Sequence, residues 1–104
     1  MESLKATQFD EKVINNSKLT IVDYGATWCG PCKKIKPILE ELAGTMADKT
    51  DIFYVDAGEE PALAQKYGVM SLPTLLFFKN GEVKDRIIGL VAKEKIIEKI
   101  NALA

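Results

Sequence analysis

Cys29 and Cys32 are the residues of this sequence with the most distinctive chemistry. Gly30 and Pro31 separate them, and residues three apart on a helix lie about 5–6 Å from each other, so small rotations can close a disulfide. As a structural link the bond would be weak, because a loop of about four residues gives roughly 2 kcal/mol, against about 3 for fifteen residues. The spacing therefore indicates a redox pair that cycles between dithiol and disulfide.

The start of a helix would give the two thiols different roles. Pro31 suits the first helical turn, where its missing N–H costs nothing, and this places Cys29 at or next to the N-cap. Unpaired N–H groups and the positive end of the helix dipole stabilise a thiolate there, so Cys29 is the predicted nucleophile and the more exposed thiol. Cys32, one turn inward, is the predicted resolving thiol, which attacks the mixed disulfide that Cys29 forms with a substrate. The lysines that follow either add positive potential or form a solvated face.

Two other interpretations of the cysteine pair remain open. Zinc usually takes four ligands, and the chain has no histidine and no second cysteine pair, so two chains would have to share the metal. The cysteines could also be free core residues at this spacing by chance. In that case the helix start, the Gly-Pro insert and the adjacent Trp28 would all be coincidences.

Size and composition limit the partners of such a site. The chain has 104 residues, 47% of them hydrophobic, which suffices for one core, so we expect a single domain over residues 1–104. Fourteen basic and fifteen acidic residues give a net charge of −1, which provides no broad field to attract nucleic acid or a membrane surface. The longest apolar stretch, Leu75–Phe78, is far shorter than the ~20 residues of a spanning helix, and the first residues lack the apolar core of a signal peptide. We expect a cytoplasmic monomer.

The first half of the chain alternates strand and helix patterns. A short strand and a helix with Thr7 as its N-cap are expected first. Buried strands are predicted at Thr20–Tyr24 and Ile52–Asp56. Between them, apolar residues recur at helical spacing from Ile35 to Met46, and Pro37 is expected to kink that helix.

The second half predicts a helix, a hairpin and a last helix. The expected bounds are a helix from Pro61 that Gly68 ends, strands Thr74–Lys79 and Val83–Ile88 joined by an Asn80-Gly81 turn, and a helix Lys93–Leu103. Parallel strands early and a hairpin late imply an α/β fold, with helices on both faces of a mixed sheet.

Asp23 is conspicuous because it is a charged residue in an apolar strand, six residues before Cys29. It could be a strand-end residue that is hydrogen-bonded to a turn. It could also be a functional carboxylate.

The sequence resembles the thioredoxin family over nearly its whole length. The most specific match is the pentapeptide Trp-Cys-Gly-Pro-Cys at residues 28–32, which follows an apolar strand and begins a helix. Further matches are Asp23, Pro37, Ser71-Leu72-Pro73-Thr74, Phe78-Lys79-Asn80-Gly81 and Gly89. The resemblance implies the thioredoxin fold, an α/β structure in which a central mixed sheet of four to five strands is flanked by four helices.

The resemblance also implies an activity, the reduction of protein disulfides. Cys29 would attack, Cys32 would resolve, and a thioredoxin reductase, usually flavin-dependent with NADPH as the ultimate electron source, would reduce the resulting Cys29–Cys32 disulfide. Disulfide-containing proteins and this reductase are the implied partners, and no bound cofactor is required beyond the redox-active disulfide. An oxidase or isomerase of the same fold stays open because direction depends on reduction potential. A binding module with incidental thiol chemistry also stays open.

Further site residues follow from the resemblance. It implies a cis Leu72–Pro73 bond, although X–Pro bonds are mostly trans, and a groove where the backbone of Leu72 pairs with substrate. It implies that Asp23 is a buried carboxylate that assists proton transfer at Cys32. An exposed apolar patch around Cys29 would consist of Trp28, Gly30, Pro31, Leu72, Ile88, Gly89 and Leu90. Ile88 and Leu90 could instead be ordinary packing residues.

Two positions depart from the family pattern. Gly25 stands where many relatives carry an aromatic residue, and Ile52 stands where many carry a lysine near the buried acid. Without a cation at position 52, desolvation should dominate at Asp23 and raise its pKa.

Overall fold

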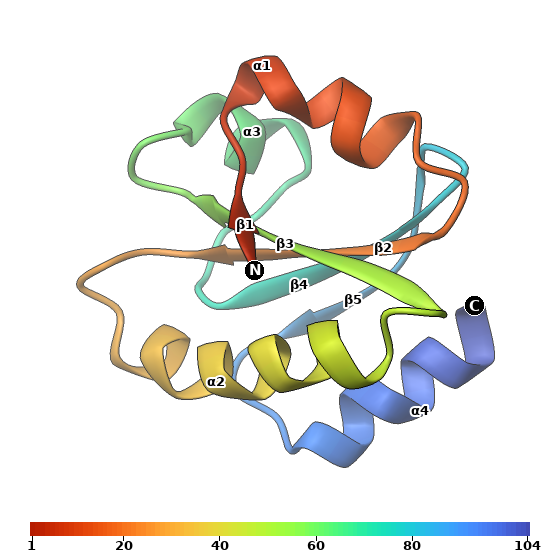
Figure 1. The fold of residues 1–104 in the computed structure, drawn as a ribbon. Coiled ribbons are helices and arrows are strands. Elements are labelled where there is room, and N and C mark those ends of the chain that lie inside the picture. Colours follow the sequence, from red (N-terminus) through yellow and green to blue (C-terminus); the bar gives the residue numbers. More distant parts are fainter.

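A five-stranded mixed sheet forms the centre of the computed structural model, which describes residues 1–104 (Figure 1). The strands are β1 (Glu2–Ser3), β2 (Leu19–Gly25), β3 (Thr50–Asp56), β4 (Thr74–Lys79) and β5 (Glu82–Ile88). Their order in the sheet is β1-β3-β2-β4-β5. β3 pairs in parallel with β1 and β2, whereas β4 is antiparallel to both β2 and β5. The predicted α/β class and mixed sheet are therefore confirmed.

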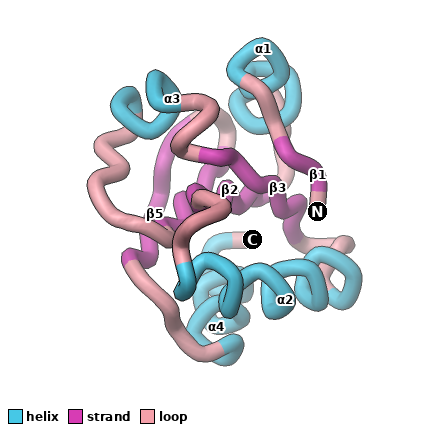
Figure 2. Tube along the Cα trace, turned by 90° about the vertical axis from the view of Figure 1, so that its left-hand side faces the viewer, coloured by secondary structure: helices cyan, strands magenta, loops and turns pink.

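Helices cover both faces of the sheet. They are α1 (Ala6–Phe9), which continues as the π-helical turn η1 (Asp10–Ile14), α2 (Gly30–Thr45), α3 (Pro61–Lys66) and α4 (Lys93–Leu103). α2 and α4 lie on one face, and α1 and α3 lie on the other, as Figures 1 and 2 both show. The sheet therefore divides the molecule into two apolar layers.

Successive side chains of β2 pack alternately into the two apolar layers. Leu19 and Ile21 pack with residues of α2 and α4 in one core cluster. Val22 and Tyr24 pack with residues of α1, η1 and α3 in the other. Because successive strand residues point to opposite faces, Asp23 projects on the α2 side.

Most of the predicted elements are confirmed. β4 and α4 have the expected bounds, and β2, β3 and β5 are one or two residues longer than expected at one or both ends. Asn80 and Gly81 both have positive φ angles, 52° and 81°, as a tight hairpin turn requires. Pro37 lies inside α2.

The predicted start of the first helix is wrong. Lys5 and not Thr7 is the N-cap of α1. The Gln8 side chain accepts a hydrogen bond from the Lys5 amide, and Glu60 accepts one from the Ala6 amide at 2.5 Å. A carboxylate from a distant part of the chain thus satisfies a helix-start amide, so no local hydroxyl is needed.

Candidate active site

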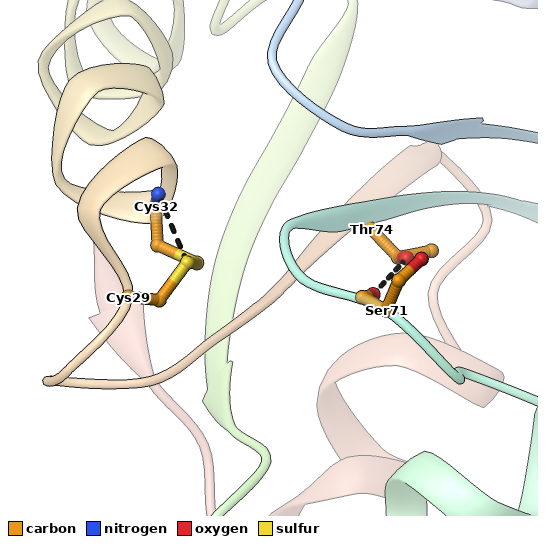
Figure 3. Close-up of a disulfide and its surroundings, with 4 residues drawn as sticks. All are labelled: Cys29, Cys32, Ser71 and Thr74. Carbon is orange, nitrogen blue, oxygen red and sulfur yellow. Dashed lines mark hydrogen bonds between the residues drawn. A yellow bond between two sulfur atoms is a disulfide. The ribbon is translucent and has the colours of Figure 1, made fainter.

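The cysteine pair lies where β2 gives way to α2. Cys29 is the N-cap of α2, with extended backbone angles, and Pro31 occupies the first turn as predicted. Cys29 and Cys32 form a disulfide, with their Cα atoms 5.3 Å apart. The Cys32 amide donates a hydrogen bond to the Cys29 sulfur at 3.2 Å, the contact drawn in Figure 3. A helix-start amide aimed at this sulfur would also stabilise a negative charge on it.

The expected difference in exposure between the two cysteines is wrong for the oxidised state. Cys29 is 6% exposed and Cys32 is 5% exposed. The disulfide joins the two sulfur atoms, and both residues pack with Ala26 and Leu72 in a small apolar cluster. Position at the helix start, rather than exposure, therefore distinguishes the two residues.

Asp23 is fully buried, and neither carboxylate oxygen has a hydrogen-bond partner. The strand-end interpretation, which required a hydrogen bond to a turn, is therefore wrong. Burial raises the pKa of Asp23 to about 7, and the positive charge of Lys36 opposes this rise. Asp23 shares a face of β2 with Gly25, and a Cβ atom added to Gly25 would lie 3.4 Å from the Cys32 Cβ. The acid thus projects on the side of the sheet that carries Cys32.

Position 52, where many relatives carry a lysine, lies on the same face of β3 as the residue opposite the buried acid. Ile52 pairs with Ile21 and is buried among core residues of α2 and α4. The β3 residue opposite Asp23 is Tyr54, two positions further along the same face. Tyr54 was missed because β2 and β3 are separated by a long helix, and the sequences of the two strands do not determine which residues stand opposite each other.

The Leu72–Pro73 bond is cis, as the resemblance implied. The segment before β4 is held at two points: the Thr74 hydroxyl donates to the Ser71 carbonyl at 2.6 Å, and the Gly89 amide donates to the Pro73 carbonyl at 2.8 Å. Figure 3 shows the turn between Ser71 and Thr74 across from the disulfide. Leu72 packs against the cysteine cluster, so this segment lines the site directly.

Exposed apolar side chains surround this end of the sheet. Trp28 is 76% exposed, Ile88 61% and Leu90 45%, so the packing interpretation of Ile88 and Leu90 is wrong. Gly30 and Pro31 are exposed at the start of α2, and Gly89 has a φ angle of 91°, which favours glycine. Met70, at 96% exposure, was missed. Its only signal in the sequence was its place three residues before Pro73.

A pocket of about 270 Å³ opens beside Cys32. Its lining residues are Ala26, Thr27, Cys32, Lys33, Lys36 and Tyr54. The Lys36 ammonium lies over the Tyr54 ring, 4.5 Å from its centre. Lys36 is thus more than a member of a solvated lysine face, because it also acts on Asp23.

Two other features bear on the sequence interpretations. The structure brings together no group of three or more histidine, cysteine or acidic residues that could hold a metal ion. None of its helices combines the length and the apolar character needed to cross a membrane.

Comparison with known proteins gives a family and named relatives. The thioredoxin family model matches residues 1–102. A thioredoxin of Staphylococcus epidermidis is 51% identical over 92 residues, which are 88% of this chain and 86% of that protein. A thioredoxin of Staphylococcus haemolyticus is 50% identical with the same coverage. A chloroplastic M-type thioredoxin of Pisum sativum is 47% identical over 90% of this chain and 55% of its own length.

This likeness covers the cysteine pair and the strands and helices that hold it. Thioredoxins use the redox-active disulfide itself and need no other cofactor. With a cysteine pair at a helix start and a family match over nearly its whole length, the chain belongs to the thioredoxin family and is a protein-disulfide reductase that works by dithiol–disulfide exchange.

Proposed function

We propose that Cys29 is the nucleophile and Cys32 the resolving thiol of this reductase. In the reduced protein the Cys29 thiolate attacks one sulfur of a substrate disulfide, the S–S bond breaks, and the first substrate thiolate leaves and takes up a proton. Cys32 then loses its proton and attacks the Cys29 sulfur, and the second substrate thiolate leaves. Two electrons pass to the substrate, and the Cys29–Cys32 disulfide remains for a partner reductase to reduce.

One observation carries this assignment. Cys29 is the N-cap of α2, and its sulfur accepts the Cys32 amide at 3.2 Å. The same amide is placed to stabilise a thiolate on Cys29 after reduction, whereas Cys32 lies three residues further along, within the first turn of α2, and no backbone amide donates to its sulfur. The backbone therefore favours negative charge on one sulfur over the other.

Asp23 is proposed as the proton acceptor for Cys32 and acts only in the second step. A carboxyl whose pKa is raised to about 7 holds and releases a proton near neutral pH. Both of its oxygens are free of hydrogen bonds, so no structural partner competes for that proton.

Substrate docking is assigned to the apolar surface around the disulfide. Trp28 contributes an exposed ring, and Leu72 and Pro73 form the facing segment, to which Gly89 is hydrogen-bonded; the backbone of Leu72 would pair with an extended substrate chain. Gly30 and Pro31 are proposed to tune the pair, because they set the short connection between the two sulfurs at the helix start.

The proposal also includes a domain organisation, a cellular compartment, an electron donor and an oligomeric state. Residues 1–104 would act as one domain, since a single sheet joins all strands from β1 to β5. The activity is placed in the cytoplasm, where thiols are kept reduced, with a thioredoxin reductase as electron donor. A monomer suffices, because every proposed site residue comes from one chain.

The test uses insulin reduction with dithiothreitol as the electron donor. We expect Cys29→Ser to abolish the acceleration, because no thiolate remains to attack. Cys32→Ser should instead accumulate mixed disulfides with substrate proteins, which Cys29→Ser does not form. Equal trapping by both variants would show that the two roles are wrongly divided.

A further inference from the structure

The Tyr54 ring fills space that the missing side chain of Gly25 leaves open. A Cβ atom added to Gly25 would lie 2.9 Å from a Tyr54 ring carbon and 3.2 Å from its hydroxyl oxygen. The same atom would lie 3.4 Å from the Cys32 Cβ. The ring therefore rests on the β2 backbone next to Cys32, and only glycine at position 25 permits this placement.

Tyr54 is also the neighbour of the buried acid. It stands opposite Asp23 in the register of β2 and β3, on the same face of the sheet. Its outer side carries Lys36, whose ammonium lies 4.5 Å from the ring centre. The pocket of about 270 Å³ reaches Tyr54, Lys36 and Cys32 but not Asp23. The ring thus stands at the boundary between solvent and the buried acid.

The charges around Asp23 come from few elements. α2 contributes the Lys36 cation and Cys32, β3 contributes Tyr54, and the β4 residue opposite Asp23 is the apolar Leu75. Burial, followed by the negative charges of Asp56, Asp23 and Glu59, raises the pKa of Tyr54 to about 12, so its phenol is neutral at physiological pH. The Tyr54 ring therefore excludes water from Asp23 without adding a charge, and Lys36 is the cation whose charge lowers the pKa of this acid.

We propose that Tyr54 is a positioning residue for proton transfer in this reductase: seated on Gly25 and covered by Lys36, its ring keeps water from Asp23 and holds the lysine charge near it. The proposal rests on the role of Asp23 put forward above. The ring and the cation then have opposite effects on the acid, because exclusion of water favours the neutral carboxyl and a nearby positive charge favours the carboxylate. Their balance sets the pH at which Asp23 accepts a proton.

The experiment is an NMR titration of the Asp23 carboxyl carbon in the oxidised protein. Tyr54→Leu should lower the midpoint by roughly one pH unit, a tenfold change in the ratio of the two forms, because water reaches the acid and desolvation acts on its pKa more strongly than the Lys36 charge. Tyr54→Phe should leave the midpoint unchanged, since the ring and not the hydroxyl excludes water from the acid. Gly25→Ala should lower the midpoint while Tyr54 stays in the sequence, because the new methyl group displaces the ring.

Lys36→Gln should shift the midpoint in the opposite direction, upward. Lys33→Gln is the matched control: Lys33 lines the same pocket but does not act on the Asp23 charge, so no shift is expected. The proposal is overturned if Tyr54→Leu and Gly25→Ala both leave the midpoint in place, or if Tyr54→Phe shifts it as far as Tyr54→Leu. If the Leu variant does not fold, the Phe, Gly25 and Lys36 variants still decide between these outcomes.

A kinetic measurement separates this proposal from the one on which it rests. The pH dependence of the second step, resolution of the mixed disulfide, should shift with the titration midpoint in each variant. If Asp23→Asn resolves as fast as the wild type, Asp23 is not the proton acceptor. The titration shifts would still report whether Tyr54 and Lys36 control the ionisation of Asp23.

Discussion

Asp23 and Tyr24 are neighbours on β2 that point to opposite faces of the sheet. Both are fully buried, and the Asp23 carboxylate and the Tyr24 hydroxyl both lack a hydrogen-bond partner. Burial raises the pKa of each group, to about 7 for Asp23 and upward from its ordinary value for Tyr24. The same shift has opposite consequences, because it brings the carboxyl into the neutral range and takes the phenol further from it.

The surroundings of the two residues differ as well. On the α1/α3 face, Tyr24 lies in an apolar cluster that includes the rings of Phe9 and Phe78, whose centres are 5.7 Å apart. On the α2/α4 face, Asp23 lies with Cys32, Tyr54 and Lys36 near a solvent pocket. On the α2/α4 face the buried polar group therefore lies beside the cysteine pair, whereas on the α1/α3 face it lies among apolar side chains only.

The largest expected effect tests whether the two faces are independent. Phe9→Ala should lower the free energy of unfolding by roughly 3–5 kcal/mol, because it empties part of the aromatic cluster. At temperatures where the variant is folded, the Asp23 titration midpoint and the rate of disulfide reduction should not change. Denaturant unfolding, NMR titration and insulin reduction measure the three quantities. Val83→Ala, at an exposed apolar position on β5, is the control and should have little effect.

Coupling between the faces would contradict this prediction. A Phe9→Ala protein that is folded but shifts the Asp23 midpoint would show that packing on the α1/α3 face reaches the acid through the sheet.

The second prediction concerns the stability cost of Asp23. The folded pKa is above the unfolded value of 3.8, so the charged form destabilises the fold as pH rises above 3.8, and the cost stops growing above about 7. Asp23→Asn should remove this cost and stabilise the oxidised protein by roughly 2–4 kcal/mol at pH 8, with little gain at pH 3. Unfolding by denaturant at both pH values measures the difference.

Asp23→Asn should also slow resolution of the mixed disulfide, because the proposed proton acceptor for Cys32 is removed. An Asp23→Asn protein that is less stable than the wild type at pH 8 and resolves the mixed disulfide equally fast would contradict both the stability cost and the catalytic role of Asp23.

The third prediction applies to the other face. Tyr24→Phe should stabilise the protein by about 1 kcal/mol, because it deletes a buried hydroxyl without a partner and keeps the ring. Disulfide reduction should not change. Tyr67→Phe is the control in the same aromatic cluster, and it should give no gain, because the Tyr67 hydroxyl is not among the buried groups without a partner. A loss of activity in Tyr24→Phe would mean that the α1/α3 face takes part in the reaction.

The smallest effect lies at the surface. The hydrogen bond from Lys99, 2.5 Å from the Asp85 carboxylate, lowers the pKa of Asp85. A lowered folded pKa gives stability that is present above the unfolded value and is lost as pH falls through the folded one. Both side chains are partly exposed, so Lys99→Met should cost less than about 1 kcal/mol at neutral pH, and high salt should reduce the difference. Lys5→Met, which breaks a longer and more exposed pair with Glu59, should cost nothing measurable.

The sequence predicted the elements well because local patterns determine them. The continuous apolar run Leu75–Phe78 and the Asn80-Gly81 turn gave β4 its bounds, and the spacing of Ile96 and Ile100 marked the inner face of α4. The cysteine pair was predictable for the same reason, since Gly30 and Pro31 fix its position at a helix start. The cis Leu72–Pro73 bond came from the family resemblance alone, because the general preference for trans points the other way.

The errors arose where distant segments decide the structure. Thr7 was assigned as an N-cap because Asp10 and Glu11 follow it, and the hydrogen bond between Ala6 and Glu60, 54 residues apart, could not be foreseen. The resemblance drew attention to position 52 alone, whereas the residue directly opposite Asp23 is Tyr54, two positions further along the same face of β3. Tyr54 could therefore be identified as the neighbour of Asp23 only from the register of β2 and β3.

The central position of β2 has a consequence for how the site responds to heat. β2 is hydrogen-bonded to β3 on one side and to β4 on the other, and the carbonyl of its last residue, Gly25, accepts the Ala57 amide at 2.8 Å. Amides in such a strand exchange with solvent only when the whole domain opens, whereas amides of edge strands exchange through local openings. The segment that carries Asp23 and leads to the cysteines should therefore be among the last to exchange deuterium. Catalytic competence and the global fold should then be lost at the same temperature, without an earlier loosening of the site.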